Sequence, residues 1–400
     1  MGKTKVSYRT AAALLGAGLT FLTIILTSEL LLLPPAFETP ARMLYRIVFF
    51  LILPARIFVE PVIPKEAHTW PLSHFAAASM IAPILYWAAW RIARAVWGYA
   101  RGRRVSASAS EGSGLTRRQF LGRPAMGIAA AAAAGVGGYA VLAAPQRLRV
   151  AEHTLPVRGL PMALNGLRIV HVTDTHYGPY NAMPYLRRAA AMANELQGDI
   201  LFFTGDYAHQ RPRTVQPGIE LLTRFKARLG AVAVLGNHDH WEGTEACKAA
   251  FAGIGIPLID NGRLFLTADG IQREPAPEQG ICLAGVGDLW ADEVRLDKAL
   301  DGIPSGMPRL LLSHNPDVAE ELDEAGRVDC MFSGHTHGGQ VSLPGVGAAI
   351  VPSQYGQKYA GGFCQGPHCP VIVSRGVGVT ILPVRFGVPP EIGLITLDQA

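Results

Sequence analysis

The C-terminal 250 residues predict an α/β fold, because short apolar runs rich in β-forming residues alternate with segments of helical periodicity. Five of these runs end in Asp, Asn or His. In α/β folds, ligands gather at the carboxyl ends of strands. The N-terminal 150 residues are apolar and basic instead, which predicts an α-helical transmembrane region ahead of the α/β domain.

Three apolar stretches are long enough to cross a bilayer, which takes about 20 helical residues. They are Ala11–Leu33, Leu72–Trp97 and Ala125–Ala144. A fourth run, Ile47–Ala55, is too short and predicts an interfacial or re-entrant helix, with a full span as the lesser alternative. The predicted organisation is a membrane region with about two spans over 1–105, a linker over 106–124, a third span over 125–145 and the α/β domain over 151–400.

The charge is divided between these two parts of the chain. Residues 1–150 contain 17 Lys and Arg against 5 Asp and Glu, whereas residues 151–400 contain 19 against 26. Basic residues precede the first span and fill the interval between the second and third, so the positive-inside rule places those segments in the cytoplasm. This predicts a multi-pass protein of the bacterial inner membrane with an extracytoplasmic C-terminal domain. The net charge of −7 on that domain argues against nucleic acid as a partner.

The linker contains a possible export signal. Thr116-Arg117-Arg118-Gln119-Phe120-Leu121 resembles a twin-arginine motif and stands just before the third apolar stretch. One interpretation is that the twin-arginine machinery exports the C-terminal domain already folded. The other is an ordinary basic stop before a membrane helix.

The C-terminal region contains the following expected elements, in chain order. Strands are expected at Leu167–Thr173, Ile200–Thr204, Ala231–Leu235, Arg309–Ser313, Cys330–Ser333, Val371–Ser374 and Gly393–Leu397. Helices are expected at Met183–Leu196 and Ile219–Leu229, and Gly/Pro-rich surface loops at 268–280 and 344–369. His171 falls inside an expected strand and is interpreted as a core histidine.

Seven polar residues near the ends of these strands form a candidate metal site. They are Asp174, His176, Asp206, Asn237, His314, His335 and His337. One Asp-x-His pair, Asp174 and His176, and one His-x-His pair, His335 and His337, have the i, i+2 spacing that places side chains on one face of an extended segment. The set contains no cysteine, which suits Mn, Fe or Zn in a nitrogen and oxygen site. Seven ligands exceed what one ion needs, and they suit two divalent ions that share a carboxylate.

These motifs, read together, resemble the calcineurin-like metallophosphoesterase superfamily over about residues 165–400. The motifs are Asp174-x-His176, Gly205-Asp206, Gly236-Asn237-His238-Asp239, His314 and Gly334-His335-x-His337. Gly338-Gly339-Gln340, Ser374-Arg375-Gly376 and Pro390-Glu391-Ile392 resemble the membrane-associated bacterial phosphodiesterase branch. The resemblance implies a four-layer α-β-β-α sandwich.

The resemblance also implies a role for each residue. Asp174, His176, Asp206 and His337 would hold the first ion; Asp206, Asn237, His314 and His335 would hold the second, with manganese favoured. His238 would be a catalytic residue that binds neither ion, and Asp239 would orient it. At the position three residues after Asp206, where many relatives have an acidic residue, this chain has His209.

The function that follows is a membrane-anchored phosphodiesterase that uses a metal-bridging hydroxide on lipid-linked or nucleotide-linked envelope phosphates. The alternative is a non-catalytic, metal-containing envelope-binding or sensor protein, which would not need His238. Candidate substrate contacts are Tyr207, His240, Trp241, Arg375 and Arg385. Cys364 and Cys369 lie in a turn-rich loop, where an exported domain could form a disulfide; Cys247, Cys282 and Cys330 are expected to be buried thiols.

Overall fold

The computed structural model describes residues 132, 135–323, 327–348 and 350–400. The first two predicted membrane spans and the linker lie outside these residues. The described end of the third predicted span is helical, with a π-helix over Tyr139–Ala143 and a 3₁₀ turn over Ala144–Gln146. Within the described ranges, no helix combines the length and the apolar character that a membrane crossing requires.

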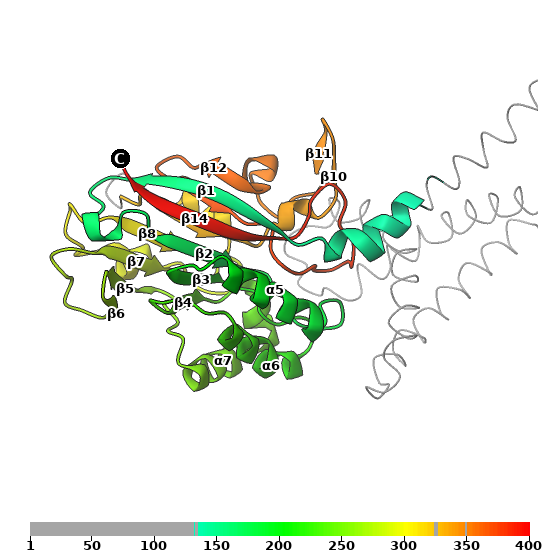
Figure 1. Cartoon of the computed structure of the whole chain (residues 1–400), viewed down its shortest axis with the longest axis horizontal. Coiled ribbons are helices and arrows are strands. Elements are labelled where there is room, and N and C mark those ends of the chain that lie inside the picture. Colours follow the sequence, from blue (N-terminus) through cyan, green and yellow to red (C-terminus); the bar gives the residue numbers. More distant parts are fainter. Residues whose placement is uncertain (1–131, 133–134, 324–326, 349) are drawn as a thin grey trace, which may run out of the picture. The chain divides into compact units, whose positions relative to one another are not determined.

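Two β-sheets form the centre of the domain (Figure 1). The first sheet has the strand order β1-β14-β2-β3-β4. Its strands are β1 (Arg149–Val157), β2 (Arg168–Val172), β3 (Ile200–Thr204), β4 (Ala231–Val234) and β14 (Glu391–Gln399). Strands β2, β3 and β4 run parallel to one another, and β14 is antiparallel to β2. This arrangement gives β2, β3 and β4 a common carboxyl edge.

The second sheet has seven strands in the order β12-β13-β9-β8-β7-β5-β6. They are β5 (Gly262–Thr267), β6 (Gly270–Gln272), β7 (Ile281–Gly285), β8 (Arg309–Leu312), β9 (Cys330–Ser333), β12 (Gly362–Gln365) and β13 (Pro370–Val373). The central strands β7, β8, β9 and β13 are parallel. A short hairpin of β10 (Ser342–Leu343) and β11 (Gly347–Ala348) stands apart from both sheets.

Alternation along the strands builds four layers. In β3, Phe202 packs between the sheets, where its ring meets Phe332 of β9 with centroids 5.0 Å apart. The next residue, Phe203, points to the opposite face and packs with the helices α5 (Met183–Glu195), α6 (Val215–Glu220) and α7 (Asn237–Ile254). The outer face of the second sheet is covered by α8 (Leu296–Leu300) and the 3₁₀ turn Pro316–Glu320. The expected α/β sandwich is therefore present.

Some predicted boundaries are wrong. Helical structure spans residues 215–224 instead of the expected 219–229, because buried Phe225 adopts an extended backbone that ends the turn. The segments expected as loops contain β6, β11 and β12. Strands β1, β5 and β7 and the helix α7 were not predicted.

The disulfide that the sequence left open is absent, since Cys364 and Cys369 are both free thiols. The β12–β13 register explains this: Cys364 faces Val371, and the amide of Gly366 donates to the carbonyl of Cys369. The two thiols are therefore diagonal across the hairpin instead of opposite, a poor arrangement for an S–S bond. Cys247, Cys282 and Cys330 are buried thiols, as expected.

Candidate metal centre

The candidate metal ligands follow five strands at their carboxyl ends. Asp174 and Asp206 come two residues after β2 and β3, and Asn237 begins α7 after β4. On the other sheet, His314 and His335 come two residues after β8 and β9. Because the two sheets pack face to face, these edges meet and all five side chains are buried together.

The backbone at the centre is strained. Asp174, His176, Asp206, His335 and His337 all have left-handed φ angles, between 42° and 67°. Non-glycine residues hold this conformation only where the surrounding structure enforces it, and such strain clusters at functional sites. The close packing is also visible at Gly334, where an added Cβ would lie 2.2 Å from Oδ2 of Asp174.

A first group of ligands surrounds Asp174. Nε2 of His337 lies 3.1 Å from Oδ1 of Asp174 and 3.0 Å from Nε2 of His176. The same nitrogen of His176 lies 3.4 Å from Oδ2 of Asp206. Potential ligand atoms of Asp174, His176 and His337 lie within 4.8 Å of one another, a spacing that one ion can bridge.

A second group shares Asp206. Nε2 of His314 lies 3.2 Å from Oδ2 of Asp206, and Nδ1 of His335 lies 3.3 Å from Nε2 of His314. Asp206 thus faces His176 on one side and His314 on the other. This is the position that a bridging carboxylate would occupy.

The electrostatics are those of a closely packed set of acids and imidazoles. Burial alone would raise the pKa of Asp206, but His314, His238 and His176 lower it far below the usual range, so the carboxylate is charged. Burial lowers the pKa of His335 to about 3, and this imidazole is neutral with a free lone pair. Charged carboxylates and neutral imidazoles are the forms that bind metal ions.

Several buried polar atoms of the centre have no hydrogen-bond partner in the protein. They include Oδ1 of Asn237 and Nε2 of His335. Buried polar atoms are normally paired, so these lone pairs call for a bound cation or water. The residues present therefore fit divalent metal ions with nitrogen and oxygen ligands.

The position of His238 agrees with a role beside the ions, but the role expected for Asp239 is wrong. His238 is partly buried, its ring lies against that of His176 with centroids 4.9 Å apart, and its amide donates to Oδ1 of Asp206. The carboxylate of Asp239 instead accepts backbone amides of Gly236, Asp206, Tyr207 and Ala208. Adjacent helical residues do not face each other, so Asp239 braces the loop that carries Asp206 instead of orienting the imidazole.

Two of the candidate substrate contacts belong to the packed interior. Tyr207 is fully buried and its hydroxyl donates to the carbonyl of Val234, which leaves no group for a substrate. Arg385 is also fully buried; its Nη2 donates to carbonyls of Arg375 and Gly376 and lies 3.4 Å from Nδ1 of His337. Both assignments as substrate contacts are therefore corrected, and Arg385 packs beside His337.

The other candidates remain accessible. Arg375 is about one-third exposed and pairs with Glu391, with Nη1 2.7 Å from Oε2. His240 is half-buried with Nδ1 3.1 Å from the hydroxyl of Thr244. Trp241 is 57% exposed and its ring lies against His238. His171 is a buried core histidine whose Nε2 lies 2.8 Å from the hydroxyl of Thr204, as expected.

Three further residues adjoin the centre and were not predicted as part of it. His209 places Nδ1 3.3 Å from Nδ1 of His238, and His176, His209 and His238 form another cluster of metal-ligand type. Asp288 is fully buried with an unpaired Oδ2, burial raises its pKa to about 6, and the ring of Trp290 lies edge-on to His335. Gly287-Asp288 follows β7 much as Gly205-Asp206 follows β3, and this signal could have found it.

Comparisons with known proteins agree with this geometry. Residues 167–339 match the family described as calcineurin-like phosphoesterase. The chain is 34% identical over 292 residues to the uncharacterized metallophosphoesterase YkuE of Bacillus subtilis, covering 71% of this chain and 98% of that protein. It is 32% identical over 271 residues to a zebrafish transmembrane protein with metallophosphoesterase domain, covering 66% of this chain and 60% of the relative.

A third relative has a named activity. The UDP-2,3-diacylglucosamine pyrophosphatase LpxG of Chlamydia trachomatis is 28% identical over 277 residues, covering 58% of this chain and 84% of that protein. Two of the relatives are named as transmembrane proteins with a metallophosphoesterase domain. The chain therefore belongs to the calcineurin-like phosphoesterase family of metal-dependent hydrolases.

Proposed function

We propose that the chain is a membrane-anchored phosphodiesterase with two divalent metal ions, acting on lipid-linked or nucleotide-linked phosphates outside the cytoplasm. The observation that carries the proposal is the position of Asp206. Its carboxylate faces an imidazole of each ligand group, 3.4 Å from His176 and 3.2 Å from His314. A single shared carboxylate between two groups suits a dinuclear site better than two separate ions.

The proposed ligand sets follow the two groups. Asp174, His176, Asp206 and His337 would hold one ion, and Asp206, Asn237, His314 and His335 would hold the other. Oxygen and imidazole donors without thiolate favour manganese, with iron and zinc as the other candidates. When bound, the ions would supply an acidified water as nucleophile and neutralise charge on the phosphoryl oxygens.

The chain's own residues would then orient the substrate and move a proton. His238 is partly buried beside the proposed ions, and burial lowers its pKa to about 4 despite the nearby Asp206. Negative charge arriving with a phosphate would favour the imidazolium form, which can protonate the leaving oxygen. Trp241 and His240 on the same helix line the approach, and Arg375 is the candidate cation for phosphate.

Membrane anchoring and orientation rest on the sequence pattern and on the relatives named as transmembrane proteins. The three apolar stretches and the basic residues between them support a catalytic domain outside the cytoplasm. Export by the twin-arginine machinery through Arg117 and Arg118 is part of this proposal. A lipid-linked diphosphate is a suitable substrate class because of the activity named for LpxG.

The test is a hydrolysis screen of the full-length chain in detergent, stripped of metal and reloaded with Mn²⁺, Fe²⁺ or Zn²⁺. The substrates are bis(p-nitrophenyl) phosphate, a phosphomonoester, a nucleotide-sugar diphosphate and a phospholipid. Metal-dependent cleavage of diesters ahead of the monoester is expected. Stoichiometric metal binding without hydrolysis of any substrate would instead support the non-catalytic binding protein.

A further inference from the structure

Large apolar side chains are exposed together at one end of the catalytic domain. Three lie on the helix that ends the third predicted span, three on or beside the β10–β11 hairpin, and one on the loop before Arg385. They are Val136, Tyr139, Leu142, Val341, Leu343, Val346 and Ile381, with exposed fractions from 39% to 76%. We call these seven residues the end patch. Such a gathering of exposed apolar residues marks an interaction surface.

The segments that carry the end patch contain no charge. Between His337 and Lys358 the sequence has no Asp, Glu, Lys or Arg, and the same holds from Gly376 to Val384. Charged residues make up 17% of the whole chain, so two such intervals side by side are unusual. A surface exposed only to water would be expected to carry charged residues at about the average frequency.

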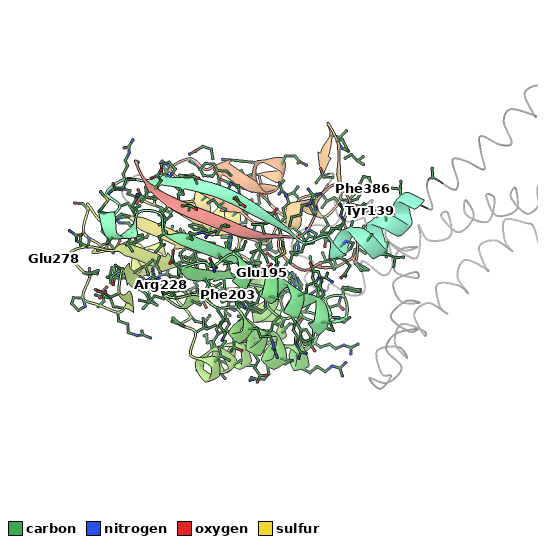
Figure 2. All side chains as sticks on the ribbon, in the orientation of Figure 1. Tyr139, Glu195, Phe203, Arg228, Glu278 and Phe386 are labelled. Atoms are coloured by element: carbon green, nitrogen blue, oxygen red, sulfur yellow. The ribbon has the colours of Figure 1, made fainter. Side chains whose placement is uncertain are left out.

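The three parts of the end patch are held together by backbone hydrogen bonds. The amide of Arg385 donates to the carbonyl of Ala140 in the helix, and the amide of Ser342 donates to the carbonyl of Phe386. The helix, the loop and the hairpin are therefore one connected unit. Figure 1 shows the hairpin and this helix at the same end of the domain, and Figure 2 shows Tyr139 close to Phe386 there, with Glu278 at the opposite end.

A basic rim borders the end patch. Arg147 and Arg149 are exposed and line a cavity of about 150 Å³ together with Tyr139 and the segment 387–389. Nη1 of Arg147 lies 3.2 Å from the hydroxyl of Tyr139. Aliphatic side chains bordered by arginines and a tyrosine match the layers of an anionic membrane surface, with acyl chains inside and phosphates at the boundary.

We propose that the end patch inserts into the interface of an anionic lipid bilayer. The catalytic domain then lies directly on the membrane instead of being connected to it only through its anchor. The inference rests on the membrane anchoring proposed above. Its occupant is the bilayer because three residues of the patch, Val136, Tyr139 and Leu142, belong to the apolar stretch Ala125–Ala144 that is the third predicted span.

The end patch is also coupled to the metal centre. His337 lies four residues before Val341, and the side chain of Gln340 bonds to both the amide and the carbonyl of Thr380. Arg385, at the end of the uncharged loop, lies against Nδ1 of His337. The segments that form the end patch thus also position residues of the metal centre. This arrangement suits a substrate whose phosphoester is part of a lipid headgroup.

The direct test labels the full-length chain in vesicles of phosphatidylethanolamine and phosphatidylglycerol that carry a diazirine-acyl lipid. After irradiation, tryptic peptides 328–358 and 376–385 are expected to carry label, and peptide 159–168, with the exposed Met162, is not. Label confined to peptides before residue 125 would overturn this inference while leaving the anchoring intact. A chain that neither floats with the vesicles nor becomes labelled would overturn the anchoring as well.

A functional test uses the double substitution Leu343→Asp and Val346→Asp. The kcat/KM for a vesicle-embedded phospholipid or lipid diphosphate cleaved by the wild type is expected to fall roughly tenfold or more. That for soluble bis(p-nitrophenyl) phosphate should be unchanged, as should both values in the control Met162→Asp. Equal activity of wild type and double variant on the embedded substrate would overturn the inference, as would cross-linking of the patch peptides to a second copy in place of lipid.

Discussion

The two sheets contribute different chemistry to the same site. The first sheet supplies oxygen ligands after β2, β3 and β4, namely Asp174, Asp206 and Asn237. The second sheet supplies imidazoles from the segments after β8 and β9, namely His314, His335 and His337. Neither half is a metal centre alone. The ligands from the second sheet include no carboxylate, and the first sheet lacks most of the nitrogen ligands. The site is thus a product of sheet packing, and each of the following changes tests that dependence.

The largest effect is expected from Asp206→Asn, which removes the negative charge shared by the imidazoles of both groups. Activity should fall roughly 10³-fold or more, with loss of at least one ion per chain. Metal analysis and kcat/KM on a diester measure this. Asp398→Asn, at an exposed position on β14 of the same sheet, is the matched control. An Asp206→Asn variant with wild-type activity would contradict the proposal that two ions share this carboxylate.

Next in size is His238→Ala, which removes an imidazole carried by the first-sheet side of the molecule. Since this residue is proposed to act on substrate, kcat should fall about 10²–10⁴-fold while metal content stays near that of the wild type. Exposed His368→Ala is the control. Loss of both ions in His238→Ala would show that this histidine is a metal ligand. The first-sheet side would then supply more of the imidazole ligands than described above.

Packing between the sheets is tested by Phe332→Ala. Its ring meets Phe202 across the interface in a buried T-shaped contact. The cavity should cost about 3–5 kcal/mol of unfolding free energy, visible as a lower Tm, and metal affinity should weaken with it. Phe363→Ala, on a half-exposed ring of the same sheet, should change stability by less than about 0.5 kcal/mol. Unaltered metal affinity in a destabilised Phe332→Ala variant would show that metal binding does not depend on the packing between the sheets.

The smallest effect concerns Asp260, which lies in the segment between α7 and β5. Burial raises its pKa to about 7, while Oδ1 accepts the amide of Leu235. The folded state therefore holds this proton more tightly than the unfolded chain, so stability falls as pH rises from about 4 through 7.

Asparagine can accept the same amide without a charge. Asp260→Asn should be more stable than wild type by about 1–3 kcal/mol at pH 8, a range reduced for partial solvent screening, and the difference should vanish below pH 4. Urea unfolding at several pH values measures this, with Asp269→Asn on the exposed β5–β6 turn as control. A difference independent of pH would show that the carboxyl of Asp260 is not buried in the way described.

Sequence patterns located most of the strands that carry the centre, because β-rich apolar runs ended in Asp, Asn or His. The strand Ile200–Thr204 and the helix from Met183 were predicted almost to the residue. Patterns failed where tertiary contacts decide the backbone, as at Phe225, and where a short strand lies inside a Gly/Pro-rich segment, as β12 does. The role of Asp239 was misjudged since its carboxylate turns toward backbone amides that only the folded loop supplies.

The sequence by itself determined the chemistry of this protein: the donor types, their spacing and their places at strand ends. It also determined the division into an apolar, basic part and an acidic catalytic part. The tertiary structure decided which atoms meet. It placed Asp206 between His176 and His314, buried Tyr207 and Arg385, added His209 and Asp288, and joined three uncharged segments into the end patch. The reason is physical, because local residue types set propensity and charge, whereas contacts between residues more than 100 positions apart exist only once the two sheets have packed.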